Sequence, residues 1–456
     1  MASNNLHIGW ADYAMLIVFL GLSVVIGIWH GCFGSKQTTT KDYLIAGGKM
    51  KMLPTAMSLF ATLCSASTLL GIPVEIYNFF SWVIASFVAS HIFIPKFREL
   101  HFMSIYTYIE KRFSVALCIS ITLTFTIGIM LFMSAILYGP SLALSQVTGL
   151  DIWVAIISCG VICAFYSSIG GMKAVIWTDV VQTIVMFLGV ILSIVFGFIN
   201  AGGIWKVFET ANTGQRINVF NFSFDPSIRY TIWSLMIGGS FYAISCSCVV
   251  QTQTQRYMCM SSTRAAQKAI WINTLMLALI LSLCSVVGLL IYSKYHDCDP
   301  LKAKLVSRSD QFYPLFVMET FERFPGLTGL FIACIMSGSL SSISSGINSI
   351  TAVMVEDIWK RLITKRALSD KFQTILSKCI YNSKSDIEKI DRSLLISCQQ
   401  TFCLCCSPTE KNSDIFQALP ANDQVTNKNG GKHEHMEGVA PEEKEPIMVR
   451  SSEDSV

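Results

Sequence analysis

One stretch of the chain combines many hydroxyl side chains with a complete lack of charge. Between positions 325 and 355 there is no Lys, Arg, Asp or Glu, yet six serines lie among the ten residues from Ser337 to Gly346. Gly338, Ser341 and Ser342 are spaced i, i+3 and i+4, so they share one face of a helix. Two hydroxyl oxygens and a backbone carbonyl on one face are ligands suited to a hard alkali cation. The pattern is therefore compatible with a cation site.

The same residues also suit a packing interface between membrane helices. Small residues let such helices approach closely, and serine hydroxyls can bond back to their own helical turn. Taken by itself, the stretch favours packing over cation binding. The choice between the two depends on the rest of the chain.

The composition predicts an all-α, polytopic membrane protein that holds this face within a lipid bilayer. The 456 residues are 52% hydrophobic and only 14% charged, against about 25% charged residues in soluble domains. Their mean hydropathy is +0.52. The formal net charge of +4 is small, and the absence of a basic run with interleaved aromatics argues against nucleic acid binding.

Windows without charged residues predict about nine transmembrane helices. The first window lacks the flanks of a cleaved signal peptide, so we expect it to be retained. The nine windows are 13–30, 53–74, 78–95, 116–140, 152–169, 180–200, 231–250, 269–292 and 326–354.

Basic residues in alternate loops predict that the N-terminus lies outside the cell and the C-terminal tail in the cytoplasm. The loops after the first, third and seventh windows contain Lys36, Lys41, Lys49, Lys51, Lys96, Arg98, Lys111, Arg112, Arg256, Arg264 and Lys268. The sequon Asn221-Phe222-Ser223 falls in a loop that this topology places outside, which predicts glycosylation at Asn221.

Two windows carry residues that interrupt helices. The second contains Thr68, Gly71 and Pro73, and the seventh contains Gly238-Gly239 ahead of further hydroxyls. Such residues at membrane depth mark unwound helices whose freed carbonyls and amides bind ions and substrate, although each window alone also fits a kinked helix. The two windows are five apart, as expected for the first helices of two inverted five-helix repeats.

The chain changes character after the last window. Residues 1–379 form the predicted membrane core, whereas residues 380–456 are polar and predict a largely disordered cytoplasmic tail. The terminal residues from Glu453 to Val456 fit, weakly, the groove of a PDZ-type partner.

Several stretches resemble the sodium:solute symporter family, over roughly residues 8–380. These stretches are 42–48, 58–62, 170–179 with Gln182, 253–257, 298–300 and the serine helix ending in Val355-Glu356-Asp357. The resemblance implies a LeuT-type inverted-repeat core in the plasma membrane, with Na+ as the coupling ion. An enzyme is disfavoured, because the windows contain no His, Cys or carboxylate cluster with catalytic or metal-ligand spacing.

The resemblance also implies a ligand set for sodium, the only metal expected. It consists of the carbonyls of Ala61, Cys64 and Gly338 and the hydroxyls of Ser341 and Ser342. All five ligands are neutral oxygens, so a bound monovalent ion keeps its charge and can leave again. This reversibility is what a coupling ion requires.

Within the family, residues 71–77 and 172–179 resemble the branch that carries iodide, monocarboxylates and vitamins. A small organic anion is therefore the expected substrate, in a cavity lined by Cys64, Thr68 and Tyr138. We expect no buried Arg or Lys in the broken helices, so the anion would meet helix N-termini, hydroxyls and the bound cation.

Asp179 and Gln182 lie at the start of the sixth window and resemble family positions near the cytoplasmic exit path of sodium. The alternative for Asp179 is a capping role at a helix N-terminus. The two interpretations have equal support at this stage.

The chain departs from the family after the serine helix, where two helices that complete the ten-helix core are missing. The exposed faces of the second, seventh and ninth windows would then be open to lipid or water. Two hypotheses result: a sodium-coupled symporter of monocarboxylate-like or vitamin-like anions, and a transport-inactive truncated isoform. The latter would bind or regulate a full-length relative, as in a hetero-oligomer.

Overall fold

A computed structural model describes residues 9–33, 39–65, 68–69, 77–100, 102–214, 216, 222–225, 231–298, 300–306 and 311–359. All of them belong to the compact unit Met1–Asp391. The predicted tail, 380–456, and the predicted glycosylation site Asn221 lie outside the described residues. The described residues form helices and one isolated bridge, between Met50 and Met260.

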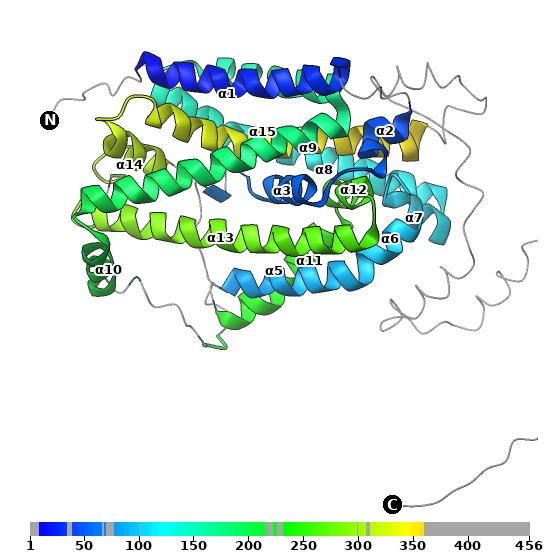
Figure 1. The fold of residues 1–456 in the computed structure, drawn as a ribbon. Coiled ribbons are helices and arrows are strands. Elements are labelled where there is room, and N and C mark those ends of the chain that lie inside the picture. The colour runs from blue at the N-terminus through cyan, green and yellow to red at the C-terminus, as the bar shows by residue number, and fades with distance from the viewer. Residues whose placement is uncertain are drawn as a thin grey trace, which may run out of the picture. The chain divides into compact units, whose positions relative to one another are not determined.

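Long helices lie side by side and form the body of this unit (Figure 1). They are α1 (Trp10–Ile28) with η1 (Trp29–Phe33), α5 (Tyr77–Val88) with η3 (Ala89–Phe93) and α6 (Ile94–Leu100), α8 (Val115–Thr148), α9 (Ile152–Ala201), α13 (Thr263–Tyr295), and α15 (Leu327–Val353) with η7 (Met354–Trp359). The shorter elements are α2 (Thr40–Ile45), η2 (Ala46–Gly48), α3 (Met52–Leu63), α7 (Tyr106–Arg112), α10 (Ile204–Thr213), η4 (Ser234–Gly238), α11 (Gly239–Ile244), η5 (Ser245–Val249), α12 (Gln251–Cys259) and α14 (Phe312–Phe321).

Each of the nine predicted windows falls on a helix of this set, the second of them only through α3. Six helices of the described part are long and apolar enough to cross a membrane, and a bent pair of helices adds a seventh candidate. Two predicted windows, 152–169 and 180–200, both lie on α9, which therefore counts once. The all-helical membrane fold predicted from the sequence is thus confirmed.

A glycine divides α9 into two arms. Gly171 has φ 57° and ψ −162°, a conformation that side-chain-bearing residues avoid, and a Cβ there would lie 2.7 Å from Cδ2 of Tyr43. The second arm therefore begins at Met172, earlier than the window that starts at position 180.

The second window is interrupted close to the predicted place, although Gly71 and Pro73 themselves lie outside the described residues. The seventh window is broken at a different place from the one predicted, because Gly238 (φ −62°, ψ −44°) and Gly239 (φ −61°, ψ −36°) both keep a helical backbone. The α3 helix ends at Leu63, where Cys64 leaves the helical region with φ −88° and ψ 89°. In the seventh window the chain becomes extended at Val250 and then bends by 51° into α12. A helix that ends within the membrane leaves its last carbonyls without partners in its own helix, which makes them available as ligands.

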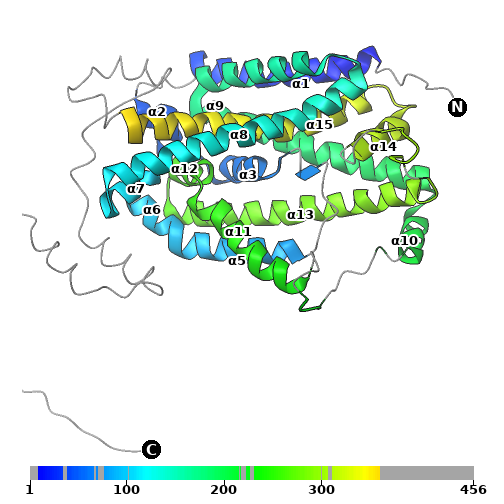
Figure 2. The same ribbon diagram turned by 180° about the vertical axis from the view of Figure 1, so that it is seen from behind.

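The serine helix α15 is buried along almost its whole length. It packs against α1, α3, α8 and α9, and the view from behind shows α8 beside it (Figure 2). The expectation that the ninth window has an open face is therefore wrong, because these neighbours enclose it. The seventh window does expose apolar side chains, among them Ile237, Phe241 and Tyr242.

Candidate functional site

The serine face of α15 meets the broken end of α3. The hydroxyl of Ser341 donates to the carbonyl of Ala61 at 2.8 Å and to that of Gly338 at 3.1 Å. The hydroxyl of Ser342 donates to the Gly338 carbonyl at 3.0 Å and to the Thr62 carbonyl at 3.4 Å. Four of the five predicted sodium ligands are thus brought together, and their donor set of neutral oxygens fits a monovalent hard cation.

The fifth predicted ligand, Cys64, follows directly after α3 and is fully buried. Its side chain belongs to the same apolar cluster as Phe60, Cys284 and Cys334. The backbone of Cys64 remains the group predicted to face the cation, since its thiol side chain is part of the hydrophobic core.

The residues predicted for the substrate cavity are not gathered into one buried cluster. Thr68 lies beyond the end of α3, and its backbone N–H donates to the Ser65 carbonyl at 3.0 Å. Tyr138 lies on α8 and is 39% exposed, whereas Cys64 is buried. The described contacts leave the roles of these three residues as predictions.

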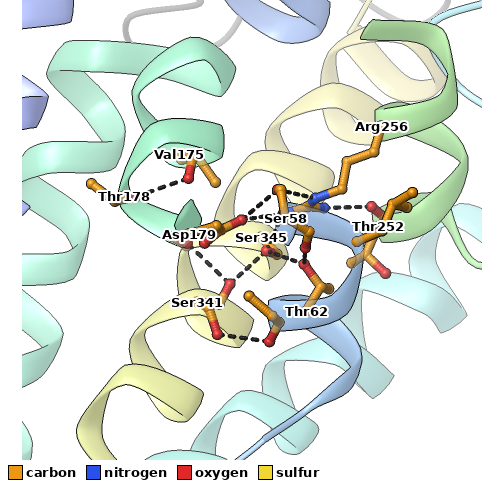
Figure 3. A network of polar contacts seen from close by, with 12 residues as sticks. Ser58, Thr62, Val175, Thr178, Asp179, Thr252, Arg256, Ser341 and Ser345 are labelled. Carbon is orange, nitrogen blue, oxygen red and sulfur yellow. Dashed lines mark hydrogen bonds and ion pairs between the residues drawn. The ribbon is translucent and has the colours of Figure 1, made fainter. Parts of the chain in front are cut away.

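A buried ion pair lies beside the serine face (Figure 3). Asp179, on the second arm of α9, and Arg256, on α12, are both fully buried, and Arg256 Nη2 lies 3.1 Å from Asp179 Oδ2. The Ser58 hydroxyl of α3 accepts a hydrogen bond from Arg256 Nε at 2.7 Å and donates one to Asp179 Oδ2 at 2.5 Å. Three separate elements are joined by this arrangement.

The position of Arg256 corrects two expectations. The sequence predicts that Arg256 lies in a cytoplasmic loop and that the broken helices contain no buried Arg or Lys. Instead Arg256 lies on the second half of the broken seventh span and is fully buried. The polar run 251–256 resembles a loop, but the amide groups of its three glutamines donate to backbone carbonyls of other segments: Gln255 Nε2, for example, donates to the Leu44 carbonyl at 2.7 Å.

A signal for this pairing was present in the sequence. Asp179 follows a largely apolar run, and a carboxylate buried among apolar residues requires a cationic partner or several donors. That requirement predicts a buried basic residue somewhere in the core. It does not identify Arg256, which is distant in the chain.

The capping interpretation of Asp179 is wrong. The second arm of α9 begins at Met172, so Asp179 lies about two turns inside that helix. Gln182 follows one turn later and is also buried. Within the described part of the chain, Asp179 Oδ1 and both polar atoms of the Gln182 side chain make no hydrogen bond. Buried polar atoms without a protein partner mark places that water or an ion can satisfy.

Hydroxyl groups link the ion pair to the serine face (Figure 3). Arg256 Nη2 donates to the Ser345 hydroxyl, which in turn donates to the Ser341 carbonyl. The Thr62 hydroxyl of α3 lies 3.0 Å from the Ser345 hydroxyl. A continuous polar path therefore connects Asp179 with Ser341 through the interior of the described helices.

Comparison with known proteins identifies relatives of this chain. The model of the sodium:solute symporter family matches residues 43–381. Human sodium-coupled monocarboxylate transporter 1 is 40% identical over 369 residues, which cover 78% of this chain and 60% of that protein. The putative sodium-dependent multivitamin transporter of Drosophila melanogaster is 40% identical over 385 residues, which cover 82% and 64%.

A third relative, the human sodium/iodide cotransporter, is 39% identical over 375 residues, which cover 80% of this chain and 58% of that protein. The chain thus spans about 60% of the length of the human relatives it matches. These relatives are transporters by name, in agreement with the expectation that the chain is not an enzyme.

A solved structure shares the fold. It is the substrate-bound, outward-open state of a Na+-coupled sialic acid symporter, with a TM-score of 0.73 and 28% sequence identity. The match covers 81% of this chain and 79% of that one. It agrees with the predicted symporter core.

Proposed function

Since the chain belongs to the sodium:solute symporter family, we propose that it couples Na+ to the movement of a small organic anion across the plasma membrane by alternating access. The observation that carries this proposal is the meeting of Ser341 and Ser342 with the carbonyls at the end of α3. The proposed sodium ligands are the carbonyls of Ala61, Cys64 and Gly338 and the two serine hydroxyls.

The coupling would arise because these ligands come from two different helices. Ala61 and Cys64 belong to the broken end of α3, whereas the two serines belong to α15. A cation that needs oxygens from both elements favours the conformation in which they are close. Movement of α3 relative to α15 would lengthen the 2.8 Å contact between Ser341 and Ala61 and release the ion.

The ion pair would serve the exit of sodium. The polar path from Ser341 through Ser345 ends at Asp179, whose second oxygen and the neighbouring Gln182 amide lack protein partners among the described residues. Arg256 compensates the charge of Asp179. Sodium can therefore pass this carboxylate without being held there by an unpaired buried charge.

The proposed substrate is a monocarboxylate-like or vitamin-like anion, by analogy with the relatives named above. Arg256 is already paired with Asp179, so it provides no free positive charge for the substrate. Helix N-termini, hydroxyls and the bound cation would supply the positive field, with Cys64, Thr68 and Tyr138 as the proposed cavity residues.

The test is uptake of labelled pyruvate and biotin by cells that express this chain, in sodium and in choline medium. The Ser341→Ala, Ser342→Ala double variant should lose sodium-dependent uptake. Ser339→Ala is the matched control, because its hydroxyl donates to the Ile136 carbonyl of α8 and not to α3. Surface expression is measured for each variant.

Sodium-independent uptake, or uptake that persists in the double variant, would contradict the proposal. A chain that reaches the surface and carries neither substrate would instead favour the second candidate, a membrane partner that binds or regulates a full-length relative. Co-expression with such a relative would then be the next measurement.

A further inference from the structure

The serine helix receives its N-terminal cap from another helix. Gly326, at the N-cap of α15, has φ 93° and provides no side-chain hydrogen bond to the first turn. The first backbone N–H groups of a helix need external acceptors. The N–H of Gly329 donates to Asp12 Oδ1 at 2.7 Å, across 317 residues of sequence.

This carboxylate is held in place by its own helix as well. Asp12 lies in the first turn of α1 and is only 6% exposed. Its second oxygen accepts a hydrogen bond from the backbone N–H of Gly9 at 3.2 Å. The two oxygens of one carboxylate thus serve the N-termini of both α1 and α15.

The two helices touch where the carboxylate bridges them. A Cβ at position 329 would lie 2.3 Å from the carbonyl oxygen of Asp12 and 2.5 Å from its Cα. Only glycine fits this approach without displacing the backbone. The contact therefore defines the position of α15 along the axis of α1, not only the distance between the helices.

The helix α1 and its continuation η1 in turn pack closely against the first arm of α9. A Cβ at Gly27 would lie 2.6 Å from Cβ of Tyr166, and one at Gly31 would lie 2.4 Å from Cγ2 of Ile169. The anchor for α15 is thus itself immobilised by two further close approaches.

The serine face lies on the same continuous helix as Gly329. Gly338 follows nine residues later, which is about 13.5 Å along the helix axis. An axial shift of α15 by one residue, about 1.5 Å, would break the contact between Ser341 and the Ala61 carbonyl. A cap that fixes the axial position of α15 consequently controls the geometry of the candidate cation site.

We propose that Asp12 is a positioning residue for sodium binding, which acts by setting the axial position of α15 through Gly329. This inference rests on the proposed function, because it concerns the same sodium site. Asp12 does not touch the ion; its effect passes through the rigid helix.

The test is the sodium dependence of thermal unfolding of the full chain, purified in detergent. NaCl is titrated against choline chloride at constant ionic strength, and the rise of the unfolding midpoint gives the half-saturating sodium concentration. The variants are Asp12→Ala, Asp12→Asn and Gly329→Ala. The midpoint without sodium reports structural damage separately from sodium binding.

Two control variants match these changes chemically. Asp151 caps its own helix, α9, by accepting a hydrogen bond from the Trp153 N–H at 2.8 Å, so Asp151→Ala removes a carboxylate cap elsewhere. A Cβ at Gly128 would have no neighbour within 4 Å, so Gly128→Ala adds a methyl group without a clash.

We expect the half-saturating sodium concentration to rise about tenfold in Asp12→Ala and Gly329→Ala, and to change by less than about twofold in the two controls. Asp12→Asn should give an intermediate value, because its amide oxygen can still accept the Gly329 N–H. If Asp12→Ala does not fold, Asp12→Asn and Gly329→Ala decide the matter.

A lower unfolding midpoint with an unchanged half-saturating concentration in the Asp12 and Gly329 variants would overturn this inference and leave only a structural cap. A wild-type chain whose midpoint does not respond to sodium would overturn the proposed function, and this inference with it. The two failures are therefore distinguishable.

Discussion

Replacement of Arg256 by Met should destabilise the chain more than any surface substitution. The guanidinium donates to Asp179, to Ser58 and Ser345, and to the Thr252 carbonyl at 2.6 Å. Its removal leaves a fully buried carboxylate with the Ser58 hydroxyl as its remaining hydrogen-bond donor among the described residues. Breaking one partner of a buried pair costs about 3–5 kcal/mol, which is the magnitude we expect here.

The second step of this experiment is a double-mutant cycle. Asp179→Asn removes the charge that Arg256→Met leaves uncompensated, so the double variant should be more stable than Arg256→Met alone. Coupling energies between residues in direct contact are about 0.5–3 kcal/mol, and we expect a value at the upper end. The assay is the unfolding midpoint of the purified chain in detergent, measured for all four proteins.

The pair formed by Lys294 and Glu319 provides the control. Its atoms Nζ and Oε2 lie 2.6 Å apart, but its side chains are 31% and 33% exposed. Solvent screening limits such a pair to about 0–1 kcal/mol, so Lys294→Met should have little effect. If Arg256→Met were equally mild, or if its cost simply added to that of Asp179→Asn, the argument that the two charges depend on each other would be refuted.

Two further substitutions test the fold around the site. Gly171→Ala should lower the free energy of unfolding by about 1–3 kcal/mol, because it places a side chain at a positive φ and against Tyr43. A surface yield and an unfolding midpoint equal to those of Gly128→Ala would contradict this expectation. Asp357→Ala should lower the free energy of unfolding by about 1–3 kcal/mol or more. This buried carboxylate accepts hydrogen bonds from the hydroxyls of Ser104, Thr107 and Thr122, and each buried hydroxyl left without a partner is unfavourable. Asp357→Asn, which keeps an acceptor, should unfold at a midpoint between those of wild type and Asp357→Ala, and equal midpoints for the two variants would contradict the hydrogen-bonding role.

The sequence was sufficient to place each apolar window on a helix and to predict the serine face, although two of the nine windows belong to the single helix α9. Apolar windows of bilayer length locate spans reliably, because the membrane imposes that length. The spacing of Gly338, Ser341 and Ser342 fixes their common face through helix geometry alone. The contact between Ala61 and Ser341 is implied only by the family resemblance. The hydroxyls and helix-breaking residues that follow α3 are nevertheless visible in the sequence.

The start of the second arm of α9 shows why window boundaries fail. Lys173 and Asp179 lie between the charge-free windows 152–169 and 180–200. A rule based on charge therefore predicts a helix that begins at position 180. In the structure Gly171 is the break, and Asp179 continues the helix because Arg256 compensates its charge. A rule based on local charge cannot anticipate a partner that folding brings from a distant segment.

The N-terminal cap of α15 has the same cause. No local residue signals it, since Gly326 is a poor cap and the acceptor lies on α1. Local patterns predict which residues form a helix, whereas the partners of its ends and of its charged side chains are properties of the tertiary structure. Both residues missed by the sequence, Asp12 and Arg256, are of this second kind.

Charge compensation at the site has a consequence for coupling. The carboxylate and guanidinium beside the serine face neutralise each other, so Na+ bound to neutral oxygens would add one positive charge to that region. An anion bound about 8 Å away would then gain about 2 kcal/mol at an effective dielectric constant of about 20. That gain corresponds to about a 30-fold higher affinity for the anion with sodium bound, and reciprocity requires the same factor for sodium.

This estimate gives a measurable expectation for an anion that the chain transports. Its half-saturating concentration in binding experiments should be about 30-fold lower in sodium than in choline, and an uncharged amide of the same shape should show a much smaller difference. Equal sodium dependence for the anion and the amide would mean that sodium acts through conformation alone. The charge argument would then fail, while the sodium site itself could still be correct.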